Sequence, residues 1–79
     1  MTLEPELRKR AQHALAAAIR GYLLRHNVVY REFGRELGIS EQYVYKLLGG
    51  RGWPSVPVLV RLRQLRVVDF NALLDDVAT

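Results

Sequence analysis

The sequence predicts an all-α domain built from five helices. Apolar residues recur every three or four positions in several stretches, which is the spacing of one face of a helix. Glycine, proline and serine are concentrated between these stretches, where they end one helix or begin the next. The chain of 79 residues has the length of one small domain. We therefore expect residues 1–79 to form a single unit.

The first helix is expected from about residue 6 to residue 26. This stretch is rich in alanine, and Gly21 is its only internal residue that disfavours a helix. Pro5 suits the first turn, because the N–H that proline lacks has no partner within the helix there. The expected apolar face consists of Leu7, Ala11, Ala14, Leu15, Ala18, Tyr22 and Leu23.

Two short helices are expected between about residues 30 and 48. The first carries Phe33 and Leu37 on one face and ends at Gly38, a residue type common directly after a helix. The second follows Ser40, whose hydroxyl can accept a hydrogen bond from the first turn. Its inward side chains are expected to be Val44, Leu47 and Leu48.

The last two helices are expected within residues 56–78. The loop GGRGWPS precedes them, and we expect Trp53 in this loop to cover the edge of the core. Ser55 and Asp69 are suitable caps for the fourth and fifth helices, respectively. The expected apolar faces are Leu59, Leu62 and Leu65 in the fourth helix, and Phe70, Leu73, Leu74 and Val77 in the fifth.

Gly34, Gly38 and Val44 have the spacing of a helix-turn-helix motif. Two helices that cross steeply touch at few points. The crossing needs a small residue in the first helix, a residue that tolerates positive φ in the turn, and an apolar residue in the second helix. The three residues meet these needs in order. An ordinary helical hairpin can contain the same residues, so the spacing alone leaves both interpretations open.

The longer run from residue 28 to residue 74 resembles the phage-repressor and Cro-like (XRE-type) family of helix-turn-helix domains. The run VVYREFGRELGISEQYVYKLLGGRGWPSVPVLVRLRQLRVVDFNALL follows the family pattern without a gap. ELGIS corresponds to the turn, GRGWPS to the following loop, VLVRLRQL to helix four and VDFNALL to the closing helix. The resemblance implies a lambda-repressor-like five-helix domain that binds double-stranded DNA.

A few positions depart from the family pattern. Val29 and Tyr30 stand where the family has Ser or Thr followed by Gln, which helps to hold a phosphate. Leu48 replaces a common acidic residue. Arg66 replaces a usual apolar residue, and Val67 replaces a frequent glycine. The order and spacing of the motifs nevertheless predict the same fold.

The resemblance places the second helix of the motif in the major groove, with its first residues facing the bases. A glutamine amide can pair with adenine, a carboxylate can accept from cytosine, and a lysine can donate to guanine. A glutamate in a first turn is equally favoured by the helix dipole, and a surface lysine is often only solvated. The residues expected to contact bases are Glu41, Gln42, Tyr45 and Lys46, and those expected to contact the DNA backbone are Tyr30, Arg31, Ser40, Tyr43 and Arg51.

The charge of the chain favours a polyanionic partner. The formal net charge is +4. Residues 28–55 contribute only +1, since four Lys or Arg are set against three Glu. We expect a sequence-specific transcriptional regulator, with repression as the expected mode, that binds double-stranded DNA as a homodimer. The alternative is a protein-interaction module on the same fold, such as an antitoxin or an antagonist of another regulator.

The composition argues against several other classes of protein. Cysteine is absent, so disulfides and thiolate metal sites are excluded, and His13 and His26 have no companions at ligand spacing. We find no nucleophile–base pair, no phosphate-binding loop and no apolar run of the roughly 18 to 20 residues that span a membrane. We expect a cytoplasmic protein that is not an enzyme, with no cofactor, metal, membrane association or small-molecule substrate.

Overall fold

The computed structural model describes residues 5–78, and this part of the chain is entirely helical apart from its connections. The five helices are α1 (Pro5–His26), α2 (Tyr30–Leu37), α3 (Glu41–Leu48), α4 (Val56–Gln64) and α5 (Phe70–Ala78). The predicted all-α, five-helix architecture is confirmed, and the first helix begins at Pro5 as its sequence indicates. No strand occurs among the described residues.

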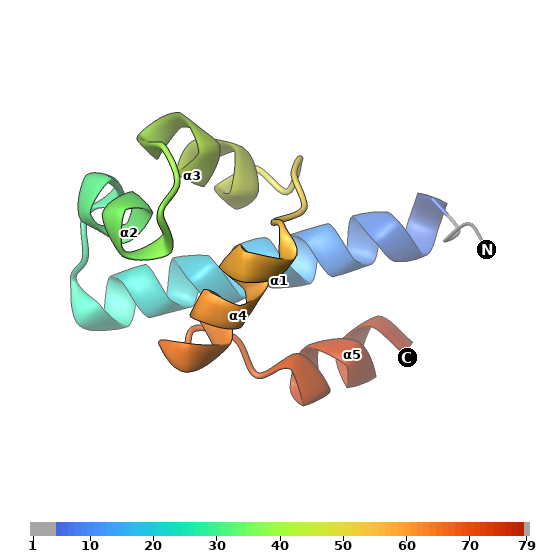
Figure 1. Ribbon diagram of the computed structural model, residues 1–79. Helices are drawn as coiled ribbons and strands as arrows, with labels where there is room; N and C mark the ends of the chain where they lie inside the picture. The colour runs from blue at the N-terminus through green and yellow to red at the C-terminus, as the bar shows by residue number, and fades with distance from the viewer. Residues whose placement is uncertain (1–4, 79) are drawn as a thin grey trace.

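The long helix α1 is the support on which the other helices are arranged. Figure 1 shows α2 and α3 above α1, α4 crossing in front of it and α5 below it. Helix α1 packs against α3 and α5, while α2 packs against α3 and α4. The short pair α2–α3 therefore stands on one side of the molecule, held from beneath by α1 and at its edge by α4.

Helices α1 to α4 end in the same backbone geometry. The residue at each turn has a positive φ: 53° at Asn27, 74° at Gly38, 69° at Gly50 and 59° at Arg66. The next N–H then donates to a carbonyl five residues earlier: Val28 to Leu23, Ile39 to Gly34, Arg51 to Lys46, and Val67 to Leu62. These bonds satisfy carbonyls that otherwise lack a partner at a helix end, and they reverse the chain direction.

The last of these turns places an arginine in the left-handed conformation. The left-handed residue after α4 is Arg66, whereas Val67 is only 5% exposed and belongs to the core. An arginine in this conformation is strained by its Cβ, unlike a glycine.

Two of the three predicted N-terminal caps are confirmed. The Ser40 hydroxyl accepts from the Tyr43 N–H at 3.1 Å, and Asp69 Oδ1 accepts from the N–H groups of Asn71 and Ala72. The prediction for Ser55 is wrong, because its side chain makes no capping hydrogen bond. Proline occupies the second position of α4, so one of the two N–H groups that a cap normally satisfies is missing.

The core is wholly apolar among the described residues. No polar or charged side chain is buried there, and no buried side-chain nitrogen or oxygen lacks a hydrogen-bond partner. All five helices contribute buried apolar side chains to it. The largest fully buried side chains are Phe33, Leu15, Ile19, Leu47, Leu62 and Val44.

The buried face of α1 differs from the predicted one. Ala16 and Ile19 are buried although neither was predicted, and they accompany Leu15 and Leu23. The remaining predicted residues are only half-buried: Leu7, Ala11, Ala14, Ala18 and Tyr22. Helix α1 is covered by other helices on more than one side. Its most buried residues lie between these contacts, so they differ from the residues that apolar periodicity alone predicts.

The predicted apolar residues of the last two helices pack against the core with one exception, Leu74, and Val58 is buried although it was not predicted. In α4, Val58 and Leu62 are buried and Leu59 is half-buried, and Leu65, which directly follows the helix, is also half-buried. In α5, Leu74 is 62% exposed and does not face the core, although Leu73 is buried. Phe70 and Val77 are half-buried. Helix α5 packs mainly against α1, so only a narrow face of it is covered.

None of the helices in the described part of the chain combines the length and the apolar character that a membrane crossing requires.

Candidate nucleic-acid interface

The sharp turn between α2 and α3 depends on Gly34. A Cβ at this position would lie 2.8 Å from the backbone oxygen of Ile39 and 3.4 Å from Cγ2 of Val44. Val44 is fully buried, and Gly38 supplies the positive φ in the turn. The three roles predicted for Gly34, Gly38 and Val44 in a helix-turn-helix crossing are confirmed. The crossing brings α2 directly beside the exposed surface of α3.

The C-terminal ends of α2 and α3 are each held by an arginine from a supporting helix. Arg20 of α1 donates to the carbonyl of Leu48 at 2.9 Å, and Arg61 of α4 donates to the carbonyl of Glu36 at 3.1 Å. A guanidinium also interacts favourably with the partial negative charge at a helix C-terminus. Sequence reasoning missed both contacts, because each joins residues distant in the chain and no local pattern reveals them.

The exposed surface of α3 carries all four residues that were predicted to contact bases. Glu41, Gln42, Tyr45 and Lys46 are exposed. Residues four apart on a helix lie on the same side, so Glu41 and Tyr45 form one row and Gln42 and Lys46 form the next. We call these four residues the α3 surface. The structure brings them together, while contact with DNA stays a prediction.

Side chains from α2 contact the first row of the α3 surface. Arg31 Nε lies 3.8 Å from Glu41 Oε1, with the two side chains 76% and 42% exposed. An ion pair this exposed contributes at most about 1 kcal/mol, so both groups stay available to another partner. The rings of Tyr30 and Tyr45 meet edge to face, with centroids 4.9 Å apart and planes at 81°.

The second row of the α3 surface is less constrained. The aliphatic part of Lys46 lies beside the loop after α3, since a Cβ on Gly52 would be 3.4 Å from Lys46 Cγ. The side chain of Gln42 is exposed and makes no hydrogen bond, ion pair or ring contact with any described residue. The side-chain amide of Gln42 therefore has its full hydrogen-bonding capacity unused.

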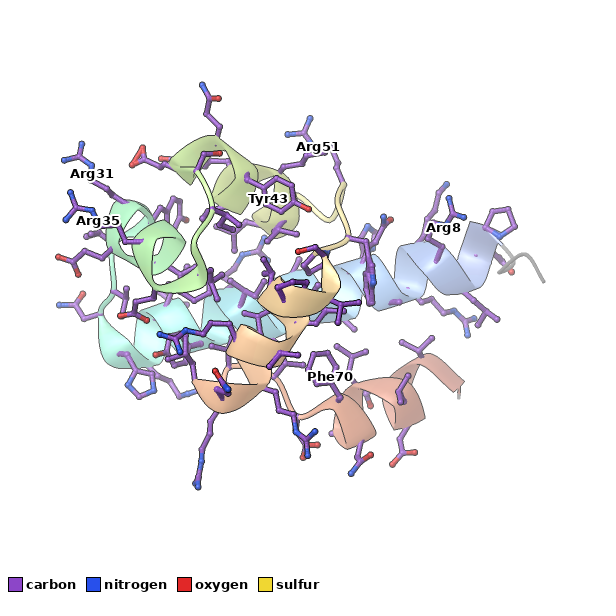
Figure 2. The ribbon with its side chains drawn as sticks, in the orientation of Figure 1. Arg8, Arg31, Arg35, Tyr43, Arg51 and Phe70 are labelled. Atoms are coloured by element: carbon purple, nitrogen blue, oxygen red, sulfur yellow. The ribbon has the colours of Figure 1, made fainter. Side chains whose placement is uncertain are left out.

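Ser40 and Tyr43, both predicted to contact the DNA backbone, already bond within the protein. The Ser40 hydroxyl caps α3, and the Tyr43 hydroxyl donates to the carbonyl of Trp53 at 3.0 Å. Tyr43 is half-buried and joins α3 to the following loop (Figure 2). Each oxygen retains acceptor capacity, but its first role is to shape the protein.

Arginines stand on both sides of α3. Figure 2 shows Arg31 and Arg35 projecting from α2, and Arg51 projecting from the loop after α3 on the opposite side. All three are exposed. Arg35 lies four residues after Arg31, which places both on one side of α2. The α3 surface is therefore flanked by positive charge at both edges.

A shallow hollow separates the first turn of α2 from α3. It has a volume of about 680 Å³ and is lined by Val28, Val29, Tyr30, Arg31, Glu32, Arg35, Glu41 and Tyr45. A second hollow, of about 370 Å³, lies where Trp53 meets Arg8, Ala11 and Gln12 of α1. Trp53 is 43% exposed, so it covers the side of α1 only in part. Among the described residues, no group of His, Asp and Glu side chains is arranged to hold a metal ion.

The chain matches no protein-family model, no curated protein and no solved structure. The chemistry and geometry of the α3 surface are therefore the basis for a functional conclusion.

Proposed function

We propose that the protein is a sequence-specific regulator of transcription that binds double-stranded DNA and places α3 in the major groove. The observation that carries the proposal is the α3 surface: four polar side chains lie exposed on one short helix, with arginines at both edges. A helix in the major groove needs this arrangement, since base edges lie ahead of it and phosphates lie on either side.

The residue types on α3 suit recognition of different bases. The free amide of Gln42 can form two hydrogen bonds with adenine, and Lys46 can donate to guanine or to a phosphate. Glu41 can accept from the amino group of cytosine, and the Tyr45 ring can contact a thymine methyl. Gln42 is the strongest candidate, because its amide can form two hydrogen bonds with one base and binding DNA costs it no existing contact.

Positive charge supports the proposal at longer range. Arg31, Arg35 and Arg51 are placed to contact phosphates on the two sides of the groove. The full chain carries a net charge of +4, which attracts a polyanion. Arg20 and Arg61 are already bonded to helix ends, so we assign them to the fold and not to the DNA.

Homodimerisation and repression form part of the same proposal. A single helix-turn-helix module covers a short DNA segment, whereas two modules about one helical turn apart read a longer site with useful affinity. Leu74 on α5 is 62% exposed and offers an apolar contact for a second copy. A dimer on a two-fold-related site blocks access to the DNA beneath it, which is why repression is the expected mode.

A protein-interaction module on the same fold is the second candidate. Val56 and Val60 are 70% and 49% exposed and lie one turn apart on α4, where an apolar pair has no obvious use in DNA binding. Glu41 also places a negative charge on the α3 surface. An antitoxin or an antagonist of another regulator would use such features.

Selection of bound sequences from random duplex DNA at physiological salt tests the proposal. We expect enrichment of an inverted repeat, and replacement of Gln42, Tyr45 and Lys46 together by alanine should abolish it. Affinity should also fall steeply as salt rises, with a slope of about −0.9 for each phosphate contact. Absence of enrichment with the wild type, or salt-independent binding, would favour the protein-partner alternative.

A further inference from the structure

Tyr30 supports Tyr45 from the side of α2. The edge-to-face arrangement of the two rings is favourable, because the positively polarised edge of one ring meets the negatively polarised face of the other. Tyr30 is half-buried and packs against the hydrophobic core, whereas Tyr45 is 52% exposed. A ring anchored in the protein therefore contacts a ring that extends into solvent.

Without this contact Tyr45 would have room to turn. Tyr30 and Tyr45 line the same open hollow between α2 and α3. An exposed side chain on a helix exchanges between its allowed rotamers unless a neighbour excludes some of them. Replacing the Tyr30 ring by a smaller side chain enlarges the space beside Tyr45, so the direction of the Tyr45 ring becomes less defined.

The neighbouring ion pair provides an internal comparison. Arg31 and Glu41 are separated by 3.8 Å, and Arg31 is mostly exposed. Solvent screens such a pair, and two flexible side chains lose entropy when they form it. Of the two contacts between α2 and the α3 surface, only the aromatic one joins an exposed residue to the packed core.

We infer that Tyr30 is a positioning residue for base recognition: it holds Tyr45 in the orientation in which Tyr45 contacts its base pair. The inference rests on the proposed function and deepens it, since it assigns part of the base preference to a residue of α2. It differs from the role that the family resemblance implies for Tyr30. A phosphate contact would need the Tyr30 hydroxyl, whereas positioning needs only the ring.

Selection from random duplex DNA with four proteins separates the two roles: wild type, Tyr30→Phe, Tyr30→Leu and Tyr45→Leu. Tyr30→Phe keeps the ring, so the selected sequences should be unchanged. Tyr30→Leu and Tyr45→Leu should both lose preference for the same base pair, since each removes or misdirects the Tyr45 ring that contacts it. The double variant Tyr30→Leu/Tyr45→Leu should lose no more at that base pair than Tyr45→Leu alone.

Val28→Ala is the matched control for lost stability. Val28 is half-buried and lines the same hollow, but it makes no ring contact with Tyr45. This variant should unfold more easily than the wild type and still select the same sequences. Loss of the same base preference in Val28→Ala would show that weakened packing, and not the Tyr30 ring, explains the effect, which would overturn the inference.

The remaining outcomes separate the inference from the function on which it rests. If the wild type selects a sequence and Tyr30→Leu selects it equally well, the inference is wrong and the proposed function stands. The same conclusion follows if Tyr30→Phe weakens binding to every sequence by a similar factor, because that is the behaviour of a phosphate contact. If the wild type selects no sequence, both are wrong.

Discussion

Arg20 of α1 donates a hydrogen bond of 2.9 Å to the backbone carbonyl of Leu48, the last residue of α3. The bond ties the end of the candidate reading helix to the longest helix of the domain. It also satisfies a carbonyl that has no partner within α3, and it places a positive charge at the C-terminal end of the helix dipole. The orientation of α3 thus depends on a residue outside the helix-turn-helix.

Arg20→Met should therefore destabilise the protein by about 1 to 2 kcal/mol, because a partly buried, charge-assisted hydrogen bond is lost while most of the aliphatic stem is kept. Urea unfolding measures the change. Arg25→Met is the control: Arg25 is exposed on the same helix and bonds to no other helix, so the free energy of unfolding should change by less than about 0.5 kcal/mol. Equal effects of the two substitutions would contradict the role of Arg20.

Gly34→Ala should destabilise the protein by about 1 to 3 kcal/mol, the range for overpacking a tight contact. The added Cβ would approach the Ile39 carbonyl oxygen to 2.8 Å, and this atom belongs to the backbone of the turn and cannot rotate away. Chemical unfolding monitored by circular dichroism gives the difference in the free energy of unfolding.

Gly49→Ala is the matched control for Gly34→Ala. The nearest atom to its added Cβ is Arg51 Nε at 3.2 Å, which lies on a flexible side chain, and φ at Gly49 is −78°. An ordinary residue adopts this φ without strain, so we expect a change within about 0.5 kcal/mol of zero. A larger loss at Gly49 than at Gly34 would show that the crossing of α2 and α3 is not as tight as the distances indicate.

Local sequence signals predicted the helices of this fold well. The helix bounds, the caps Ser40 and Asp69 and the turn residue Gly38 are set by interactions between residues close in the chain. Predictions that depend on tertiary packing were less accurate. Ile19 and Leu74 illustrate the difference: apolar periodicity cannot reveal that α1 is covered on several sides and α5 mainly on one. The exposure of the α3 surface was predictable from helical spacing. The contacts that brace it could not be predicted, because they join separate helices.

Arg66→Gly should stabilise the protein by about 0.5 to 1 kcal/mol. Arg66 adopts a φ of 59°, a conformation that costs an ordinary residue about 1 kcal/mol or more and costs glycine little. The gain is partly offset by the greater freedom of glycine in the unfolded chain. Thermal unfolding measures the change in stability.

Arg63→Gly, within α4, should do the opposite and lower the free energy of unfolding by about 1 kcal/mol, because glycine is unfavourable inside a helix. A loss at both positions would mean that the Arg66 side chain contributes more than its backbone conformation costs.

Glu41→Gln tests the electrostatics of the proposed DNA complex. The substitution removes a negative charge from the α3 surface and releases Arg31 from its ion pair, so Arg31 can turn to a phosphate. We expect affinity for unrelated duplexes to rise by about five- to thirtyfold at low salt, since removal of one close repulsion and addition of one phosphate contact each contribute roughly 0.5 to 1 kcal/mol. The dependence of affinity on salt should steepen by about one phosphate contact. Fluorescence anisotropy with a labelled duplex at several salt concentrations measures both quantities.

Glu6→Gln, in the first turn of α1, changes the net charge equally but lies away from α3, so it should raise affinity much less (Figure 1). Equal gains from the two variants would mean that only the overall charge matters, and that α3 is not at the DNA.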